Sequence, residues 1–96
     1  MGQLNDVIHQ PARLRIMATL TTLERDSEVD FVYLRDLLKL TDGNLGAHLT
    51  KLEEAGYLRL IKKFVSRLPR TYVRLTPAGR RAFEDHVETL RAIISG

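Results

Sequence analysis

The 96-residue sequence contains no cysteine and no tryptophan, and the missing cysteine excludes whole classes of protein. The chain can form neither a disulfide framework nor a thiolate metal site, which suits a reducing compartment. Proline is scarce, at three residues, while 44% of the residues are apolar. This is the composition of one modest core and not of a disordered chain. We therefore expect a single domain over residues 1–96, with no separate sensor domain.

Long apolar runs and secretory features are missing too. The longest apolar runs, such as those at 32–34 and 93–94, are far shorter than a bilayer span. The first twenty residues lack the basic-then-apolar order of a signal peptide. The sequence therefore predicts a cytoplasmic protein that has no membrane partner.

Catalytic and metal-binding patterns are absent from the sequence. Serine occurs only at positions 27, 66 and 95, with no glycine-rich phosphate loop and no paired-carboxylate setting. The histidines His9, His48 and His86 are scattered and have no second ligand at a useful spacing. We therefore predict no enzyme activity, no catalytic residue, no metal and no cofactor.

The sequence does have a concentration of positive charge in its second half. Residues 1–48 carry five basic and seven acidic side chains, whereas residues 49–96 carry ten and five. The stretch 59–81 contains eight basic residues and no acidic one. Such a block favours a polyanionic partner, although a solvated basic surface has the same composition.

Apolar spacing and capping residues predict the first elements. Apolar residues recur every three or four positions up to Leu23, with Pro11 in the first turn of a helix. Residues 29–31 form too short a segment for anything longer than an edge strand. The leucines within residues 34–38 indicate a short second helix. A third helix follows, with Thr41 or Asp42 as its N-cap. Two helices that meet across so short a turn are typical of a helix-turn-helix.

The pattern changes from helical to alternating after Gly56, which ends the third helix. Strands around 57–61 and 71–75 then enclose a basic hairpin tip at 66–70, and Thr76 caps a last helix that runs to Ser95. We predict a fold that is mainly α with a small β-hairpin (α+β), a winged helix-turn-helix in the order α-β-α-α-β-β-α. Its recognition helix lies at about 42–55, its wing at about 57–75 and its closing helix at about 77–95.

The third helix has the two faces that DNA reading requires. If Leu45, Leu49 and Leu52 are buried, a rotation of about 100° per residue puts small residues on the far face. The asparagine at position 44 can form two hydrogen bonds with the edge of an adenine. The aspartate at position 42 can accept a hydrogen bond from the amino group of a cytosine. A face of glycine and alanine allows close approach of a backbone, which is either that of DNA or that of a neighbouring helix.

The hairpin tip offers a second contact with DNA. Arg67 and Arg70, backed by Lys62 and Lys63, can straddle phosphates or enter the minor groove. Such contacts increase the affinity for DNA and fix the position of the protein on the duplex, but they contribute little to sequence specificity. The alternative interpretation is an ordinary charged hairpin without a ligand. The helix-turn-helix beside it favours DNA binding over this alternative.

These motifs resemble small winged-helix regulators of the MarR and ArsR type from about residue 8 to residue 94. The resemblance rests on LTDGNLGAHL at 40–49 and LEEAGY at 52–57 for the recognition segment, and on PRTY at 69–72 and LTPAGR at 75–80 for the wing and closing helix. It implies a sequence-specific transcriptional regulator that binds double-stranded DNA at a palindromic operator as a homodimer. It also implies DNA contacts on the recognition segment and the wing, at Thr41, Asp42, Gly43, Asn44, Ala47, His48, Thr50, Lys51, Lys62, Lys63, Arg67, Arg70 and Thr71. Whether His48 touches DNA or packs beneath the hairpin stays open.

The last helix carries apolar residues at a four-three-four spacing, close to a coiled-coil seam. We expect it to pair with a second copy, the alternative being that it folds back onto the first helix of the same chain. The predicted dimer contacts come from both terminal segments and are Leu4, Val7, Ile8, Phe83, Val87, Leu90 and Ile94.

Two other functions compete with this prediction. One is a winged helix used for protein–protein interaction, which has less reason to keep a basic wing. The other is an effector- or metal-responsive repressor. The metal sensors of the ArsR type carry cysteine pairs, or acid and histidine ligands on the last helix, where this chain has only Asp85, His86 and Glu88. Typical MarR proteins have additional terminal helices around a ligand pocket, so the existence of an effector stays open.

Overall fold

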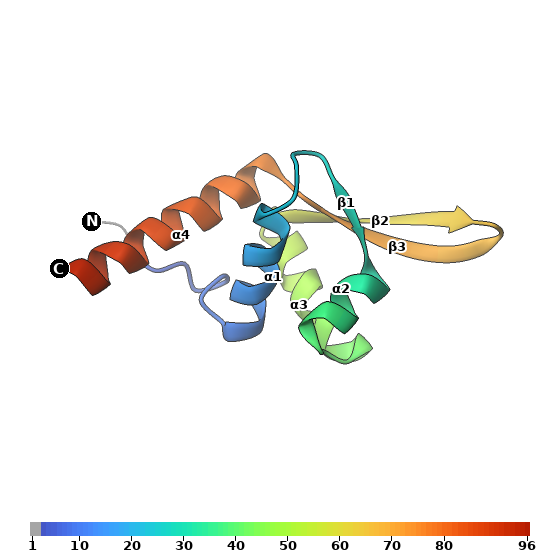
Figure 1. Ribbon diagram of the computed structural model, residues 1–96, viewed down its shortest axis with the longest axis horizontal. Coiled ribbons are helices and arrows are strands. Elements are labelled where there is room, and N and C mark those ends of the chain that lie inside the picture. Colours follow the sequence, from blue (N-terminus) through green and yellow to red (C-terminus); the bar gives the residue numbers. More distant parts are fainter. Residues whose placement is uncertain (1–2) are drawn as a thin grey trace.

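The computed structural model describes residues 3–96, so the first two residues of the predicted domain lie outside the described part. The predicted order of elements and the winged helix-turn-helix fold are confirmed (Figure 1). The elements are α1 (Pro11–Thr21), β1 (Glu28–Asp30), α2 (Phe31–Leu38), α3 (Asp42–Glu54), β2 (Leu58–Val65), β3 (Leu68–Leu75) and α4 (Pro77–Ser95). Among the helices of residues 3–96, none combines the length and apolarity that a membrane crossing needs.

The three strands form an antiparallel sheet in the order β1-β3-β2. The predicted edge strand is present, because β1 pairs only with the stretch 72–74 of β3. The β2–β3 hairpin extends well beyond β1, and it projects from the body of the molecule as the wing (Figure 1). The molecule is therefore elongated, with principal extents of 53 × 25 × 21 Å.

The hairpin tip is shorter than the sequence predicts. Pairing continues out to Val65 and Leu68, and only Ser66 and Arg67 form the turn, with φ angles of 52° and 67°. Two consecutive positive φ angles are typical of the tight turn whose twist matches that of the flanking strands. Pro69 is tolerated in the strand because the Phe64–Pro69 pair, the second from the turn, is one whose residues form no hydrogen bonds with each other. The N–H group that proline lacks would therefore not have bonded to β2.

The core lies where α1, α2 and α3 pack against one face of the sheet. The apolar stripe of α3 is buried as expected, with Leu45, Leu49 and Leu52 fully inaccessible to solvent. The other buried apolar residues are Ile8, Ile16, Met17, Leu20, Leu34, Leu38, Leu58 and Val73. Burying this stripe orients α3 and leaves its opposite face outward.

Capping groups set both ends of α3. Of the two candidate N-caps, Thr41 is the one used, since its hydroxyl accepts from the backbone N–H of Asn44 at 3.1 Å. At the other end Gly56 has a φ of 82°, and Tyr57 N–H donates to the carbonyl of Leu52 at 3.0 Å. This is the glycine-terminated helix end that the sequence predicts.

The first half of α4 lies against the body of its own chain. Gly79 is buried, and a Cβ at that position would lie 1.9 Å from the carbonyl oxygen of Tyr57, so only glycine permits this approach. Arg80 donates to the carbonyls of Thr21 and Leu23 at 3.1 and 3.3 Å, which ties α4 to the end of α1. The second half of α4 extends away from the other elements (Figure 1).

Candidate nucleic-acid interface

The outer face of α3 is open. Gly43, Asn44, Ala47, Thr50 and Lys51 are all exposed. Apart from its chain neighbours and the nearby backbone of α3 itself, a methyl group added at Gly43 or at Gly46 would meet no atom of residues 3–96 within 4 Å. No neighbouring helix of residues 3–96 therefore approaches these glycines, and the close approach of DNA stays a prediction. The face is smooth enough for a groove wall to lie close to the helix backbone.

Asp42 stands at the start of this face, where its carboxylate is held by a cation. Arg35 of α2 donates to Asp42 at 2.7 Å and also pairs with Asp36 at 2.9 Å. These two carboxylates raise the pKa of Arg35, so the arginine stays charged. The pair links the two helices of the helix-turn-helix and leaves Asp42 largely exposed.

His48 is half-buried on the flank of α3 that faces α1. Its Nδ1 lies 3.3 Å from a guanidinium nitrogen of Arg13. Because arginine only donates, His48 Nδ1 accepts and the ring proton is on Nε2. Burial lowers the pKa of His48, and the charge of Arg13 lowers it further. His48 thus packs beside α1 through its Nδ1 edge, and contact of its other edge with DNA stays a prediction.

The basic residues of the wing divide between its two faces. Side chains of directly paired residues point to the same face, and Leu60 with Val73 faces the core. Lys62 and Thr71 continue that helix-side face. The pair Lys63–Arg70 therefore lies on the opposite, outer face.

Acidic residues of β1 partly neutralise that outer face. Lys63 pairs with Glu28 at 2.6 Å, and Arg70 pairs with Asp30 at 2.9 Å. Hydrogen bonds from Lys63 and then Arg74 lower the pKa of Glu28. Burial acts to raise the pKa of Asp30, but hydrogen bonds from Arg70 and from the first turn of α2 outweigh it, so the pKa is lowered.

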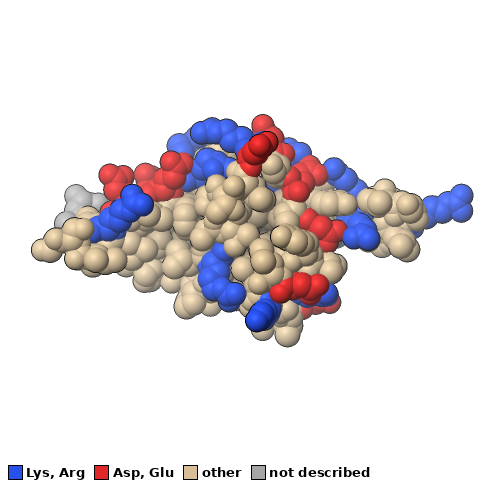
Figure 2. All heavy atoms as spheres, viewed as in Figure 1, with Lys and Arg blue, Asp and Glu red and all other residues tan. Residues whose placement is uncertain are grey.

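These contacts divide the basic residues of the wing into those with and those without a carboxylate partner. On the outer face, Lys63, Arg70 and Arg74 already have carboxylate partners, because the edge strand β1 carries acidic residues against them. Within residues 3–96, Lys62 and Arg67 take part in no ion pair. Figure 2 shows basic atoms at the outermost point of the wing and mixed charge nearer the body.

Sequence reasoning missed an apolar surface on the same wing. Phe64 is 80% exposed and Leu68 is 62% exposed, with Val65 exposed beside them. The signal was present in the letters KKFV at 62–65, which continue the strand alternation beyond position 61. The sequence-based prediction uses only the basic residues of that stretch.

The predicted dimer residues differ in how far they are accessible. Leu4, Val7, Phe83, Val87 and Leu90 are half-buried, whereas Ile94 is 82% exposed. Ile8 is fully buried in the core of the single chain, so its prediction as a dimer contact is wrong. Phe83 and Val87 also line an open groove of about 640 Å³ between α4 and the end of α1.

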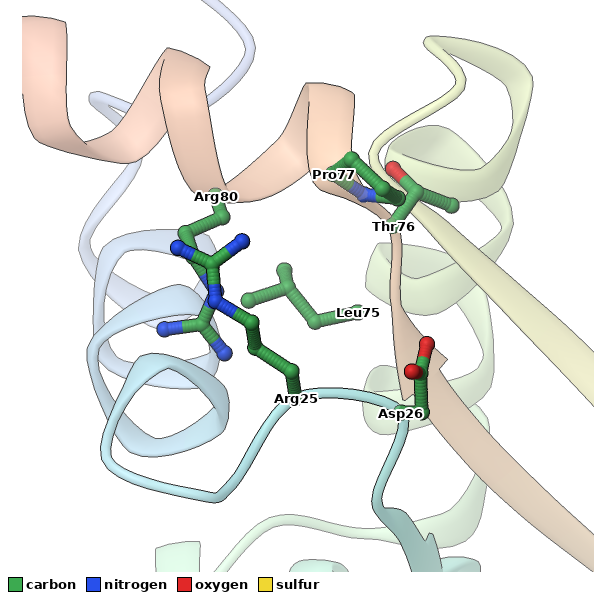
Figure 3. A pocket seen from close by; sticks show the side chains of 6 residues that line it. All are labelled: Arg25, Asp26, Leu75, Thr76, Pro77 and Arg80. Carbon is green, nitrogen blue, oxygen red and sulfur yellow. The ribbon is translucent and has the colours of Figure 1, made fainter.

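A smaller pocket lies between the α1–β1 loop and the start of α4 (Figure 3). Arg25 and Arg80 point toward one end of it, while Asp26 stands at the other. Its volume of about 120 Å³ is well below the roughly 300–1,000 Å³ typical of small-molecule sites. Its size therefore provides no support for an enclosed effector site.

A buried histidine joins the N-terminal segment to α4. His86 is 1% exposed; its Nδ1 accepts from the backbone N–H of Asn5 at 3.1 Å, and its Nε2 lies 3.3 Å from Nδ1 of His9. The proton of neutral His86 is thus on Nε2, and its Nδ1 lone pair accepts from Asn5. Neither ring nitrogen therefore has a free lone pair with which to bind a metal. Nor does any cluster of three potential ligands occur in residues 3–96.

A helix-turn-helix with an open outer face, followed by a projecting hairpin, defines the class of winged helix proteins. A model of the family described as winged helix DNA-binding domain matches residues 12–94. The chain belongs to this family.

Three known proteins illustrate the similarity. The chain is 37% identical over 81 residues to the uncharacterized protein MJ0432 of Methanocaldococcus jannaschii, covering 84% of this chain and 85% of that protein. The structure of a transcriptional regulator homologue from Pyrococcus horikoshii OT3 matches with a TM-score of 0.85 and 32% identity, covering 94% of this chain and 86% of that one. A protein from Porphyromonas gingivalis W83, described as a regulator of the MarR family, shares the fold at a TM-score of 0.58 and 14% identity, with 94% of each chain covered. The resemblance to winged-helix transcriptional regulators is confirmed. The likeness to the Porphyromonas gingivalis protein shows the fold alone.

Proposed function

We propose that this protein is a sequence-specific regulator of transcription that binds double-stranded DNA as a homodimer on a palindromic operator in the cytoplasm, without enzyme activity. The observation that carries the proposal is the open glycine-containing face of α3, together with wing cations that have no carboxylate partner in residues 3–96. A buried leucine stripe fixes that face outward, as a helix in the major groove requires.

The helix and the wing divide the work of binding. Asn44, Thr50 and Lys51 supply polar groups on the α3 face, where hydrogen bonds to base edges select sequence. Gly43 and Ala47 allow the close approach, and His48 offers its Nε2–H at the flank. Contacts to phosphates come from the wing, where the cations supply affinity without sequence choice.

The wing contacts differ in strength from those expected from sequence. Lys62 and Arg67 have no carboxylate partner in residues 3–96, so their charge is fully available to phosphates. Lys63 and Arg70 must share theirs with Glu28 and Asp30. The hydroxyl of Thr71, on the helix-side face, adds a hydrogen-bond donor to that surface.

Dimerisation rests on α4. Its second half extends from the body with Ile93 and Ile94 exposed, and half-buried Val87 and Leu90 precede them on the helix. Exposed apolar side chains at the end of a projecting helix are stabilised when a partner covers them. Two copies related by a two-fold axis would present two recognition helices about 34–36 Å apart.

Selection of bound fragments from random duplex DNA, at two salt concentrations, tests the function directly. We expect recovery of an inverted repeat with half-sites about one helical turn apart, and affinity that falls steeply with salt. Recovery of unrelated sequences would remove the sequence-specific part of the proposal. Failure to bind any duplex, even at low salt, would overturn it.

Paired substitutions separate the two kinds of contact. Arg67→Ala should weaken binding to all sequences alike and reduce the salt slope by about one. Asn44→Ala should instead cost about 1–3 kcal/mol on the selected site and relax preference at one position. Arg70→Ala is the matched control on the wing, with a smaller expected effect because Asp30 already compensates its charge. Binding that is unaffected by all three changes contradicts these roles.

A protein-interaction module is the second candidate function, favoured by one observation. Tyr33 and Leu37, one turn apart on α2, are exposed apolar side chains that the fold of residues 3–96 leaves uncovered. The selection experiment decides between the two functions, since a protein-docking module would not enrich a DNA sequence.

A further inference from the structure

The end of the wing is more apolar than phosphate binding requires. Four of its strand residues are Phe64, Val65, Leu68 and Pro69, and all four are exposed. Large apolar side chains in water are unfavourable, and at the tip of a projecting hairpin nothing in residues 3–96 covers them. Contacts to phosphates alone would be served by a polar tip.

Strand register sorts these residues into two pairs with different surroundings. Phe64 is directly opposite Pro69, two positions along from the Lys62–Thr71 pair and four from Leu60–Val73. Phe64 and Pro69 therefore lie on the helix-side face of the wing. Val65 and Leu68 form the other pair, on the outer face. The more exposed aromatic ring is thus on the face of the sheet against which α3 packs.

Positive charge flanks the aromatic ring along the hairpin. Lys62 precedes Phe64 by two positions on the same face, and Arg67 stands in the turn beyond it. Figure 2 shows this arrangement as uncharged atoms near the end of the wing with basic atoms at its extremity. Two cations around an exposed apolar side chain complement a surface with anionic rims and an apolar interior. The minor groove of duplex DNA, with phosphates on both edges and stacked bases between, is such a surface.

We propose that Phe64 is an apolar wedge that enters the minor groove beside the recognition site, partly unstacks one base step and bends the duplex. The inference rests on the proposed DNA binding and adds a mode of specificity to it. Proline at position 69 stiffens the strand behind the ring, since its backbone φ is restricted. Lys62 and Arg67 hold the phosphates on either side of the inserted ring.

A wedge of this kind reads the deformability of DNA and not its hydrogen-bonding groups. Pyrimidine–purine steps unstack most readily, so the selected operators should carry TA or CA/TG steps where the wing meets the flank. That preference would occur at a position that no polar side chain of the protein contacts.

The test uses the full chain and the duplex recovered by selection. One strand carries 2-aminopurine at the flanking step, whose fluorescence rises when the base unstacks, and the duplex ends carry a donor–acceptor dye pair that reports bending. We expect the wild-type protein to raise the fluorescence and to shorten the distance between the ends. Phe64→Ser should abolish both changes and weaken binding about tenfold.

Leu68→Ser is the matched control, because it removes a comparably exposed apolar side chain from the outer face of the same hairpin. It should leave the fluorescence change and the bend in place, and both variants should unfold at the wild-type temperature. A duplex bound but left straight by the wild type, or a bend that survives Phe64→Ser, overturns the wedge while leaving DNA binding intact. Equal losses in both variants also overturn it. If the wild type binds no duplex, the proposed function fails together with the wedge.

Discussion

At the scale of single residues, the buried His86 makes folding dependent on protonation. His86 is buried and uses both ring nitrogens, one accepting from Asn5 and the other donating to His9. A second proton on the His86 ring would sit on Nδ1 and point at the backbone N–H of Asn5. Burial lowers the pKa of His86, and the neighbouring His9 lowers it further. The docking of the N-terminal segment on α4 therefore requires a neutral His86.

This arrangement predicts how stability depends on pH. A histidine with a pKa below its unfolded value of 6.5 binds its proton more readily in the unfolded chain. The free energy of unfolding should be highest above pH 6.5 and should decrease as the pH falls below that value. Half-buried His48, whose pKa is also lowered, adds to the same trend. Urea unfolding followed at pH 7.5 and pH 5.5 measures the difference.

His86→Gln provides the control for that measurement, because an amide cannot titrate in this range. The variant should be less stable at pH 7.5 and should lose a smaller amount on acidification. An undiminished pH dependence in the variant would show that His86 is not its source. The lowered pKa values of Glu28 and Asp30 act separately, since their stabilising effect is lost only as the pH falls below about 4.5.

At the scale of elements, two helical glycines have opposite surroundings. Gly79 brings α4 onto the carbonyl of Tyr57, where a Cβ would lie at 1.9 Å, whereas Gly46 on α3 has open space around it. Gly79→Ala should destabilise the protein by about 3 kcal/mol, because backbone must move to accept the methyl group. Gly46→Ala should stabilise it by about 1 kcal/mol through helix propensity. Chemical denaturation of both variants measures the two changes.

The same pair of variants bears on function. Gly46→Ala adds a methyl group to the outer face of α3, so it should weaken DNA binding even though it stabilises the fold. A loss of affinity with a gain in stability is the pattern of a residue selected for close approach to a ligand. Equal stability of the two alanine variants would contradict the packing described for Gly79.

The helix-turn-helix itself follows from short-range signals. The cap at Thr41 and the stop at Gly56 act within one turn of their own positions, so the sequence predicts α3 to within a residue of its observed ends. The pairing of the wing cations could not be predicted in this way. Glu28 and Asp30 lie about 35 to 40 positions before their partners, and only the sheet brings them together.

At the scale of the whole molecule, α4 and the wing project from the body in different directions (Figure 1). The half of α4 beyond the body exposes Ile93 and Ile94. Sedimentation at micromolar concentration should detect a dimer, and Ile94→Asp together with Val87→Asp should convert it to a monomer by placing charges on the seam. Leu37→Asp, which changes an exposed apolar residue on α2, should leave the dimer intact. A wild-type monomer would defeat the prediction.

The fold was predictable because its signals are local. Periodicity, caps and glycine stops determined the number and order of the elements, and a stripe of leucines determined which face of α3 is buried. The fate of α4 was not predictable in the same way. Its apolar seam fits both packing onto α1 and pairing with a copy, and in the structure Phe83 packs against the core while Ile94 does not.

The amino-acid sequence alone determined that this chain forms a winged helix with an outward glycine face, since helix caps and apolar periods act between residues a few positions apart. Tertiary structure alone decided which wing cations have a carboxylate partner, that His86 is buried, and that Phe64 is exposed to solvent. Each of these depends on the neighbours that a residue meets when distant segments pack, and those neighbours are set by the sheet and by the approach of α4 to Tyr57.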